Sequence, residues 1–378
     1  MSLAVILITA AGLLAKSFIR LQQVDIGIET RHLLTSHIAI PVDRYRTQAD
    51  IVRFYRELLL RARSIPGVEE VALSPTVPPQ SRRIRLAVTS DGGSPGGVSV
   101  EPDTTVVPIS PNLLHLFKVP LIGGRYFSDS DGKDNRHVGI ISARAAQVFF
   151  GGTNAIGKHL KIEGDSSDVE IVGVVRDVLY GNRTDQIGPT VYVPFEQYPY
   201  WGNFILIKTQ ESPAAIFRPL QNAIANVDPE IPIGELRSVD DRIADSVALP
   251  RFRFLLLGLL GLAAALLTFI GIYGTITHYI AQRRTELAIR AALGSSPGNL
   301  NLLLFRSIAS AASVGIMAGL LGAVAISRMM VGMLFNTAPL DLEVLLFGSV
   351  FIFFLIALAV TLSARSVHDI NPAELLRN

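Results

Sequence analysis

The sequence contains no cysteine and few charged side chains. Without cysteine, the chain cannot form disulfides, thiol nucleophiles or zinc–thiolate sites. Only 17% of its residues are charged, whereas soluble domains carry about 25%. This deficit excludes a disordered chain and argues against a wholly soluble one. Lys+Arg (34) nearly balance Asp+Glu (32), leaving a net charge of +2, so we expect no nucleic-acid partner.

Apolar residues make up 49% of the chain and collect in stretches that are almost free of charge. These stretches are 3–15, 254–280, 307–327 and 344–362. Crossing a bilayer takes about 20 helical residues, so the last three are long enough. The first gains length only if it continues to residue 19, with the Lys16 side chain extended toward the interface. The sequence therefore predicts four transmembrane helices in a lipid bilayer.

Two alternatives concern the first stretch. It could be a cleaved signal peptide, but Met1 and Ser2 supply no basic region before it. It could also be part of a longer native helix, preceded by another segment of the same protein. We expect a helix that stays in the membrane, over residues 1–19.

Residues 20–250 have a different composition. They hold most of the charges, nearly all the proline and the only tryptophan, Trp201. The predicted domain order is therefore a first transmembrane helix (1–19), an inserted water-soluble domain (20–250) and a region with three further transmembrane helices (251–378).

Arginine in the short loops predicts the orientation of these helices, because cytoplasmic loops are enriched in Lys and Arg. Three arginines lie in 281–300, two in the tail 363–378 and one in 327–343: Arg283, Arg284, Arg290; Arg365, Arg377; Arg328. We therefore expect 281–300 and both termini on the cytoplasmic side, and 20–250 outside the cell membrane.

Local patterns in 20–250 predict an α/β domain, with a mixed sheet and packed helices. Three helices are expected: one opened by a capping box at Thr47 and Asp50 and closed at Pro66-Gly67, one over 143–150, and one starting at Ser212-Pro213. Buried strands are expected at 169–175 and 203–208, an edge strand with proline at 190–194, and a surface region at 74–103.

Two motifs in this domain resemble ligand sites but depart from them. Residues 152–158 read G-x-x-x-x-G-K, but His159 follows where a nucleotide loop needs Ser or Thr. A helix precedes this loop and a strand follows it, which is the reverse of a phosphate site. Residues 129–134 resemble a calcium loop, but Gly132 comes too early and the closing Glu is missing. We interpret both segments as turns, the second as a solvated one.

No other constellation of catalytic or ligating residues is evident. The seven histidines are scattered without metal-ligand spacing, and no serine lies in a nucleophile elbow. The sequence thus predicts no catalytic residue, cofactor site or metal site, and no enzyme.

Glycines in the third apolar stretch are candidates for close helix packing. Gly315, Gly319 and Gly322 have the small-residue spacing that lets membrane helices approach one another. They could pack within the bundle, form a subunit interface, or reflect only the general frequency of glycine in membrane helices.

The predicted cytoplasmic loop reads QRRTELAIRAALG at 282–294. It favours a short helix over 285–293, with an apolar stripe and charges of both signs. Such a helix could anchor in the membrane interface or dock a cytosolic partner. The docking hypothesis assigns this role to Arg283, Arg284, Glu286, Arg290 and Gly294.

Several motifs give the chain a family resemblance. Residues 251–378 resemble the permease domain shared by the MacB and FtsX families of ABC transporters. The motifs are Tyr279, the segment 282–294, Leu334-Phe335, PLD at 339–341, SAR at 363–365 and NPAELLR at 371–377. Residues 1–250 resemble the MacB-like periplasmic core domain, with IPGV at 65–68, PLIGGR at 120–125, NAIGK at 154–158, IVGVV at 171–175 and VYVP at 191–194.

This resemblance implies a permease of the cell (inner) membrane that works with a separate cytosolic ABC ATPase. It further implies a second permease copy or a tandem half, mechanotransmission from the ATPase to the external domain, and, for an export system, a periplasmic adaptor. An alternative is an FtsX-type regulator of external or cell-wall enzymes, which carries a smaller external domain. A membrane-tethered enzyme or receptor is a third reading, for which the external domain shows no polar constellation.

Overall fold

The computed structural model of the protein describes residues 2–79, 84–94, 97–132, 136–152, 154–165, 167–181, 187–282, 297–334 and 341–368. The chain divides into two compact units. The external unit is Val24–Val247, and the membrane unit combines Met1–Gln23 with Ala248–Asn378.

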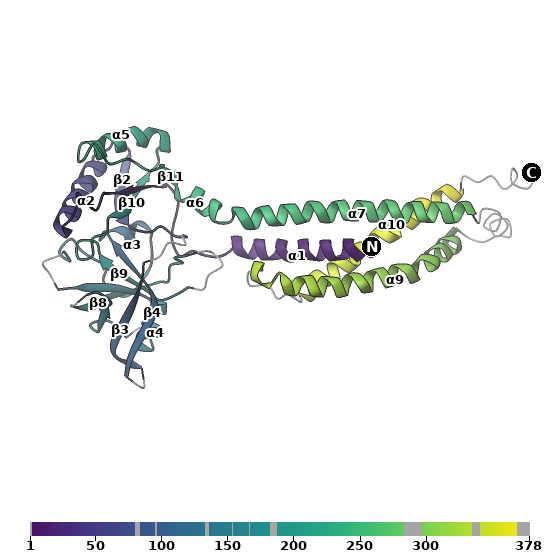
Figure 1. Cartoon of the computed structure of the whole chain (residues 1–378), viewed down its shortest axis with the longest axis horizontal. Coiled ribbons are helices and arrows are strands. Elements are labelled where there is room, and N and C mark those ends of the chain that lie inside the picture. The colour runs from purple at the N-terminus through teal and green to yellow at the C-terminus, as the bar shows by residue number, and fades with distance from the viewer. Residues whose placement is uncertain are drawn as a thin grey trace, which may run out of the picture. The chain divides into compact units, whose positions relative to one another are not determined.

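One half of the external unit is an antiparallel four-stranded sheet covered by two helices. The sheet has the order β11 (Arg237–Ser238), β1 (Leu33–Ala39), β10 (Gly202–Thr209), β2 (Val68–Ser74). The helices are α2 (Gln48–Arg63) and α5 (Pro213–Ala225) (Figure 1). Helix α2 begins as the capping box predicts, because the Asp50 amide donates to Thr47 Oγ1 at 3.1 Å. Its apolar face, with Tyr55 and Leu58 fully buried, packs in the core beneath the sheet.

The other half of the external unit is a small closed barrel. Its strands are β3 (Arg85–Ser94), β4 (Gly97–Ile109), β5 (Leu121–Gly124), β6 (Val138–Ser142), β7 (His159–Ile162), β8 (Asp168–Val175) and β9 (Thr190–Pro194). The order is β5-β8-β6-β9-β4-β3-β7, and β7 pairs again with β8, which closes a ring from β8 to β7, while β5 adds to β8 outside the ring. Closure satisfies the strand edges that an open sheet would expose. Two short helices, α3 (Leu113–Leu116) and α4 (Ala143–Phe150), complete this half.

The mixed α/β class predicted from the sequence is confirmed, although the strands form a sheet and a barrel instead of one mixed sheet. The described residues of 85–103 are the paired strands β3 and β4, two strands that the sequence did not predict. One local expectation was wrong. Strand β9 lies between β4 and β6, not at an edge. Proline is tolerated there because Pro194 is the last residue of the strand.

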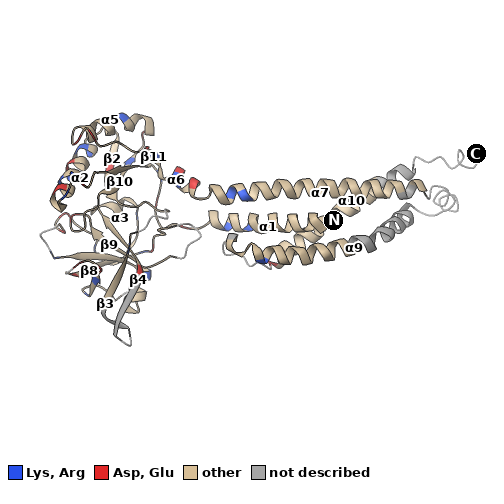
Figure 2. Ribbon diagram, in the orientation of Figure 1, with Lys and Arg blue, Asp and Glu red and all other residues tan. Residues whose placement is uncertain are grey.

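The described part of the membrane unit contains four α-helices: α1 (Ser2–Gln22), α7 (Ala248–Gln282), α9 (Pro297–Met329) and α10 (Leu342–His368). Among the described residues, three helical segments are long and apolar enough to cross a membrane: Ser2–Gln22, Ala248–His278 and Leu342–Leu362. Ser313–Met329 in α9 is a shorter apolar segment. Figure 2 shows few charged residues along these helices. Helices α1 and α10 each contact the other three, and α1 has the more extensive contacts, so it is the centre of the packing within this unit.

Candidate functional site

The two chain segments that connect the external unit to the membrane helices meet in one sheet. Strand β1 is the first strand after α1, whereas β11 and helix α6 (Val239–Ser246) directly precede α7. Strands β1 and β11 pair antiparallel, with Leu34 opposite Ser238 and Thr35 opposite Arg237. We call this pairing, together with the contacts of α6 on β1, the connector seam.

Side chains lock helix α6 onto β1 at the connector seam. Ser238 caps the helix, because its Oγ accepts from the Asp241 amide at 3.0 Å. Arg242, half-buried, donates from Nε to Thr35 Oγ1 at 2.6 Å, and its guanidinium lies 5.1 Å from the centre of the Phe204 ring. Burial and the nearby Arg237 charge lower the pKa of Arg242, but an arginine remains charged at neutral pH. Arg242 therefore ties the segment leading into α7 to two strands of the sheet.

A partly exposed cluster of one lysine and two carboxylates joins two helices of the membrane unit. Lys16 Nζ in α1 lies 2.6 Å from Asp341 Oδ2 and 2.6 Å from Glu343 Oε2, at the start of α10. The Asp341 side chain is only 11% exposed. In the sequence, the first apolar stretch ends before Lys16 because of the charge on this residue. That charge is neutralised by carboxylates more than 300 residues away along the chain.

The three glycines predicted to allow close packing lie in α9, and two of them contact α1. A Cβ on Gly319 would lie 2.6 Å from Val5 Cβ, and one on Gly322 would lie 2.5 Å from Ile6 Cδ1. Gly315 is partly exposed. By contrast, Gly258, Gly271 and Gly274 of α7 each have open space where a Cβ would be, and a Cβ on Gly261 would make only an ordinary contact with α1, 3.5 Å from the Leu7 carbonyl oxygen.

The residues proposed to dock an ATPase lie outside the described part of the chain. Arg283, Arg284, Glu286, Arg290 and Gly294 all fall in 283–296. Their role is therefore argued from the sequence and from the family.

The G-x-x-x-x-G-K segment has the helix–turn–strand order that the sequence predicted, with α4 before it and β7 after it. The Gly157 amide donates to the Ile171 carbonyl at 2.8 Å and is not available to a phosphate. Lys158 Nζ lies 4.9 Å from the centre of the Phe150 ring, in a cation–π contact. The segment is a turn that fixes β7 beside β8.

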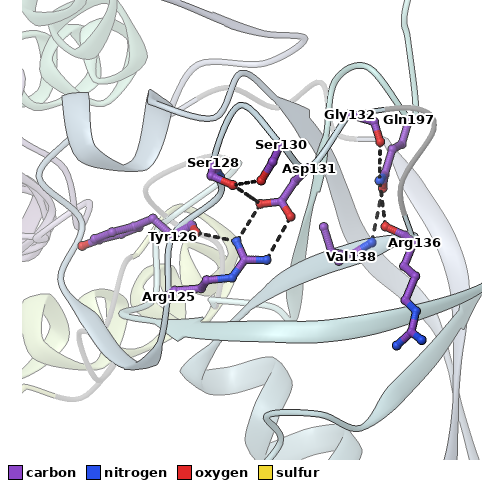
Figure 3. A network of polar contacts seen from close by, with 9 residues as sticks. All are labelled: Arg125, Tyr126, Ser128, Ser130, Asp131, Gly132, Arg136, Val138 and Gln197. Carbon is purple, nitrogen blue, oxygen red and sulfur yellow. Dashed lines mark hydrogen bonds and ion pairs between the residues drawn. The ribbon is translucent and has the colours of Figure 1, made fainter.

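The segment that resembles a calcium loop is a turn, as predicted, and residues 128–130 are exposed, but the Asp131 carboxylate is buried. Asp131 accepts two hydrogen bonds from Arg125, at 2.6 and 2.9 Å, and one from the Ser128 hydroxyl at 3.1 Å (Figure 3). The Ser128 amide also donates to it, at 2.9 Å. The Arg125 guanidinium occupies the position beside the Asp131 carboxylate that a bound metal cation would need. Among the described residues, no group of three or more His, Cys, Asp or Glu is arranged to hold a metal ion.

Low pH should weaken the hydrogen-bonded ion pair of Asp131 and Arg125. Burial alone would raise the pKa of Asp131, but hydrogen bonds from Arg125 and Ser128 outweigh it and keep the pKa below the ordinary 3.8. A carboxyl whose pKa is lower in the folded state stabilises the fold above its unfolded pKa and loses this effect as pH falls through the folded value. We expect Asp131→Asn to cost about 1–2 kcal/mol of unfolding free energy at pH 7, discounted because Arg125 is half-exposed.

The measurement is denaturant unfolding of wild type and Asp131→Asn between pH 7 and pH 2.5. The difference between the two should shrink once the pH drops below the ordinary aspartate value, because wild-type Asp131 then also becomes neutral. If the difference in unfolding free energy stayed constant over the whole pH range, Asp131 would not stabilise the fold as an ionised carboxylate.

Comparison with known families accounts for both units. The MacB-like periplasmic core domain matches residues 2–223, and the FtsX-like permease C-terminal domain matches residues 258–372. The first match alone covers more than half of the chain, so the chain belongs to the MacB/FtsX family of ABC permeases. It is a membrane protein with a periplasmic or extracellular domain, and its family is one of permeases and not of enzymes. FtsX/MacB-family permeases pair with ABC ATPases.

Solved structures of external domains show more distant similarity. The periplasmic region of MacB from Actinobacillus actinomycetemcomitans has 11% identity and a TM-score of 0.40, covering 60% of this chain and 97% of that one. The extracellular domain of the noncanonic ABC-type transporter YknZ from Gram-positive bacteria has 16% identity and a TM-score of 0.36, covering 53% and 100%. No curated protein gives a significant match. The family assignment therefore depends on the two family models.

Proposed function

We propose that the protein is the permease subunit of a mechanotransmission-type ABC transporter used for export. A separate cytosolic ATPase hydrolyses ATP, the membrane helices move, and the external unit moves with them. The connector seam carries this proposal. The chain segments following α1 and preceding α7 are hydrogen-bonded neighbours in one sheet, so a displacement of either helix reaches the same two strands.

The proposed partners are a cytosolic ABC ATPase, a second permease copy or tandem half, the lipid bilayer and, for export across two membranes, a periplasmic adaptor. The alternative, an FtsX-type regulator, would have a smaller external domain. The sheet and barrel spanning Val24–Val247 favour export. In the proposed topology both termini and residues 283–296 are cytoplasmic.

The test of this function is to break the seam without touching the ATPase contact. Arg242→Ala removes the link from α6 to Thr35 and to the Phe204 ring. Because the chain has no cysteine, a fluorophore on Ser94→Cys, in the barrel, labels a single position. In nanodiscs containing the permease and its ATPase, ATP should change this fluorescence in the parent protein. We expect the change to fall at least threefold in Arg242→Ala, while ATP hydrolysis continues.

Arg218→Ala is the matched control, because Arg218 is an exposed arginine of α5. It removes the same side chain from the external unit without altering the seam, so its ATP-dependent signal should equal that of the parent. The proposal fails if the parent protein shows no ATP-dependent signal, or if Arg242→Ala and Arg218→Ala behave alike.

A further inference from the structure

A cavity of about 490 Å³ in the external unit is lined by residues of the barrel strands and of the loops beside them. This volume lies within the range of small-molecule sites, about 300–1,000 Å³. Apolar side chains of three strands form its wall: Leu86, Val106 and Ile162. The aromatic residues Tyr198 and Tyr200 also line it. None of the residues discussed under the proposed function belongs to this cavity.

A hydrogen-bonded cluster of titratable side chains lies in the same cavity. His137 Nδ1 is 3.0 Å from Asp165 Oδ2, and the Tyr198 hydroxyl donates to the same carboxylate oxygen. Burial would raise the pKa of Asp165, but hydrogen bonds from Tyr198, the Ser167 amide and His137 outweigh it and keep the pKa low. The carboxylate is therefore ionised at neutral pH and can only accept, so the Nδ1 of His137 carries the proton. When the ring carries only this proton, Nε2 is an acceptor.

The position of His137 is fixed from the neighbouring loop. Gln197 Nε2 donates to the Arg136 carbonyl at 3.1 Å, and Gln197 Oε1 accepts from the Val138 amide at 3.3 Å (Figure 3). These bonds hold the backbone on both sides of His137. The next residue after Gln197 is Tyr198, whose ring meets the His137 ring edge to face at 5.7 Å. A side chain held in this way by supporting hydrogen bonds is prepared to bind a ligand without reorganisation.

The chemistry of the lining indicates which ligand fits. Glu163 and Asp165 are acidic, and among the described residues that line the cavity there is no lysine or arginine. The Glu163 side chain is exposed, and its Oε2 accepts from the Ala87 amide at 3.1 Å. The lining side chains of Gln48, Ser167 and Tyr200 are neutral, so the carboxylates and the aromatic faces, both of which attract a cation, set the ligand preference. We propose that this cavity binds a small amphipathic amine, with its ammonium group at His137 and Glu163 and its apolar body against the barrel strands.

The probe for this site is 4-phenylbutylamine, titrated calorimetrically into the full-length protein in nanodiscs. The neutral 4-phenylbutanol and the anionic 4-phenylbutanoate have the same apolar body and serve as comparators. We expect the amine to bind at least tenfold more tightly than either. Glu163→Gln keeps the shape of the side chain and an acceptor for Ala87, but removes the charge. It should weaken amine binding about tenfold and leave alcohol binding unchanged.

Glu69→Gln is the control for loss of a carboxylate, because Glu69 does not line the cavity; it should bind the amine as the parent does. His137→Phe keeps a ring against Tyr198 but removes the acceptor, and should also weaken amine binding. Equal binding of the three probes, preference for the carboxylate, absence of binding, or an unchanged Glu163→Gln would each overturn the proposal. The titration contains no ATPase, so its result is independent of the proposed transport function.

Discussion

Replacing Gly319 with leucine should disrupt the membrane unit. The new Cβ would lie 2.6 Å from Val5 Cβ and 3.1 Å from the Ser2 carbonyl oxygen. Neither atom can rotate away, because one is bonded directly to the backbone and the other belongs to it. Helix α9 must then move off α1, which is the centre of this unit. Overpacking a tight interface costs about 1–3 kcal/mol and occasionally more, and we expect a value at the upper end.

Two further variants test whether the loss of stability depends on how tightly each glycine is packed. Gly322→Ala should be milder, since its Cβ meets the flexible end of the Ile6 side chain. Gly274→Leu is the matched control in α7, where nothing lies within 4 Å of a built Cβ. The measurement is the fraction of detergent-solubilised protein that remains monodisperse after heating to increasing temperatures. Equal loss for Gly319→Leu and Gly274→Leu would show that the α9–α1 contact does not limit stability.

Removing either charge of the proposed docking helix should cost thirtyfold or more in affinity for the ATPase. Glu286 and Arg290 are four residues apart, so they share one face of the helix expected over 285–293. If they paired only with each other at the surface, each substitution would cost a few tenths of a kcal/mol. If either side chain instead pairs with a desolvated charge on the ATPase, removing it leaves that charge unpaired. This costs about 2–5 kcal/mol of binding free energy. Since tenfold in affinity is about 1.4 kcal/mol, the docked helix predicts the larger loss.

Copurification of the ATPase with Glu286→Ala and Arg290→Ala measures this loss. Arg328→Ala removes a charge from the last turn of α9, at the end expected on the opposite side of the membrane, and should copurify as the parent does. A thiol at Ser296→Cys should react only after permeabilisation, which places the helix on the cytoplasmic side. Full copurification and activity of both loop variants would leave only a membrane-surface anchor.

The sequence alone was sufficient for features that depend on near neighbours along the chain. The cap at Thr47 and the helix 143–150 that Ser142 caps require only residues a few positions apart. Strand β8 follows from its own β-branched run. The long apolar helices follow from hydropathy, and the family follows from short motifs that the two family matches confirm. The false phosphate loop could be rejected because helix, turn and strand succeed one another locally.

Only the tertiary structure decided which distant segments meet. Sequence patterns do not encode the closing pair β7–β8 or the central place of β9, because pairing partners are selected by the packing of whole strands. Lys16 contacts Asp341, and Arg242 contacts Thr35. The residues of each pair lie too far apart in the sequence for a periodic pattern to predict the contact. The cluster of His137, Asp165 and Tyr198 joins three loops, each of which reads as an ordinary turn. Local physical chemistry determined the elements and the class of this protein, whereas burial and hydrogen bonding between distant elements determined its seam and its cavity.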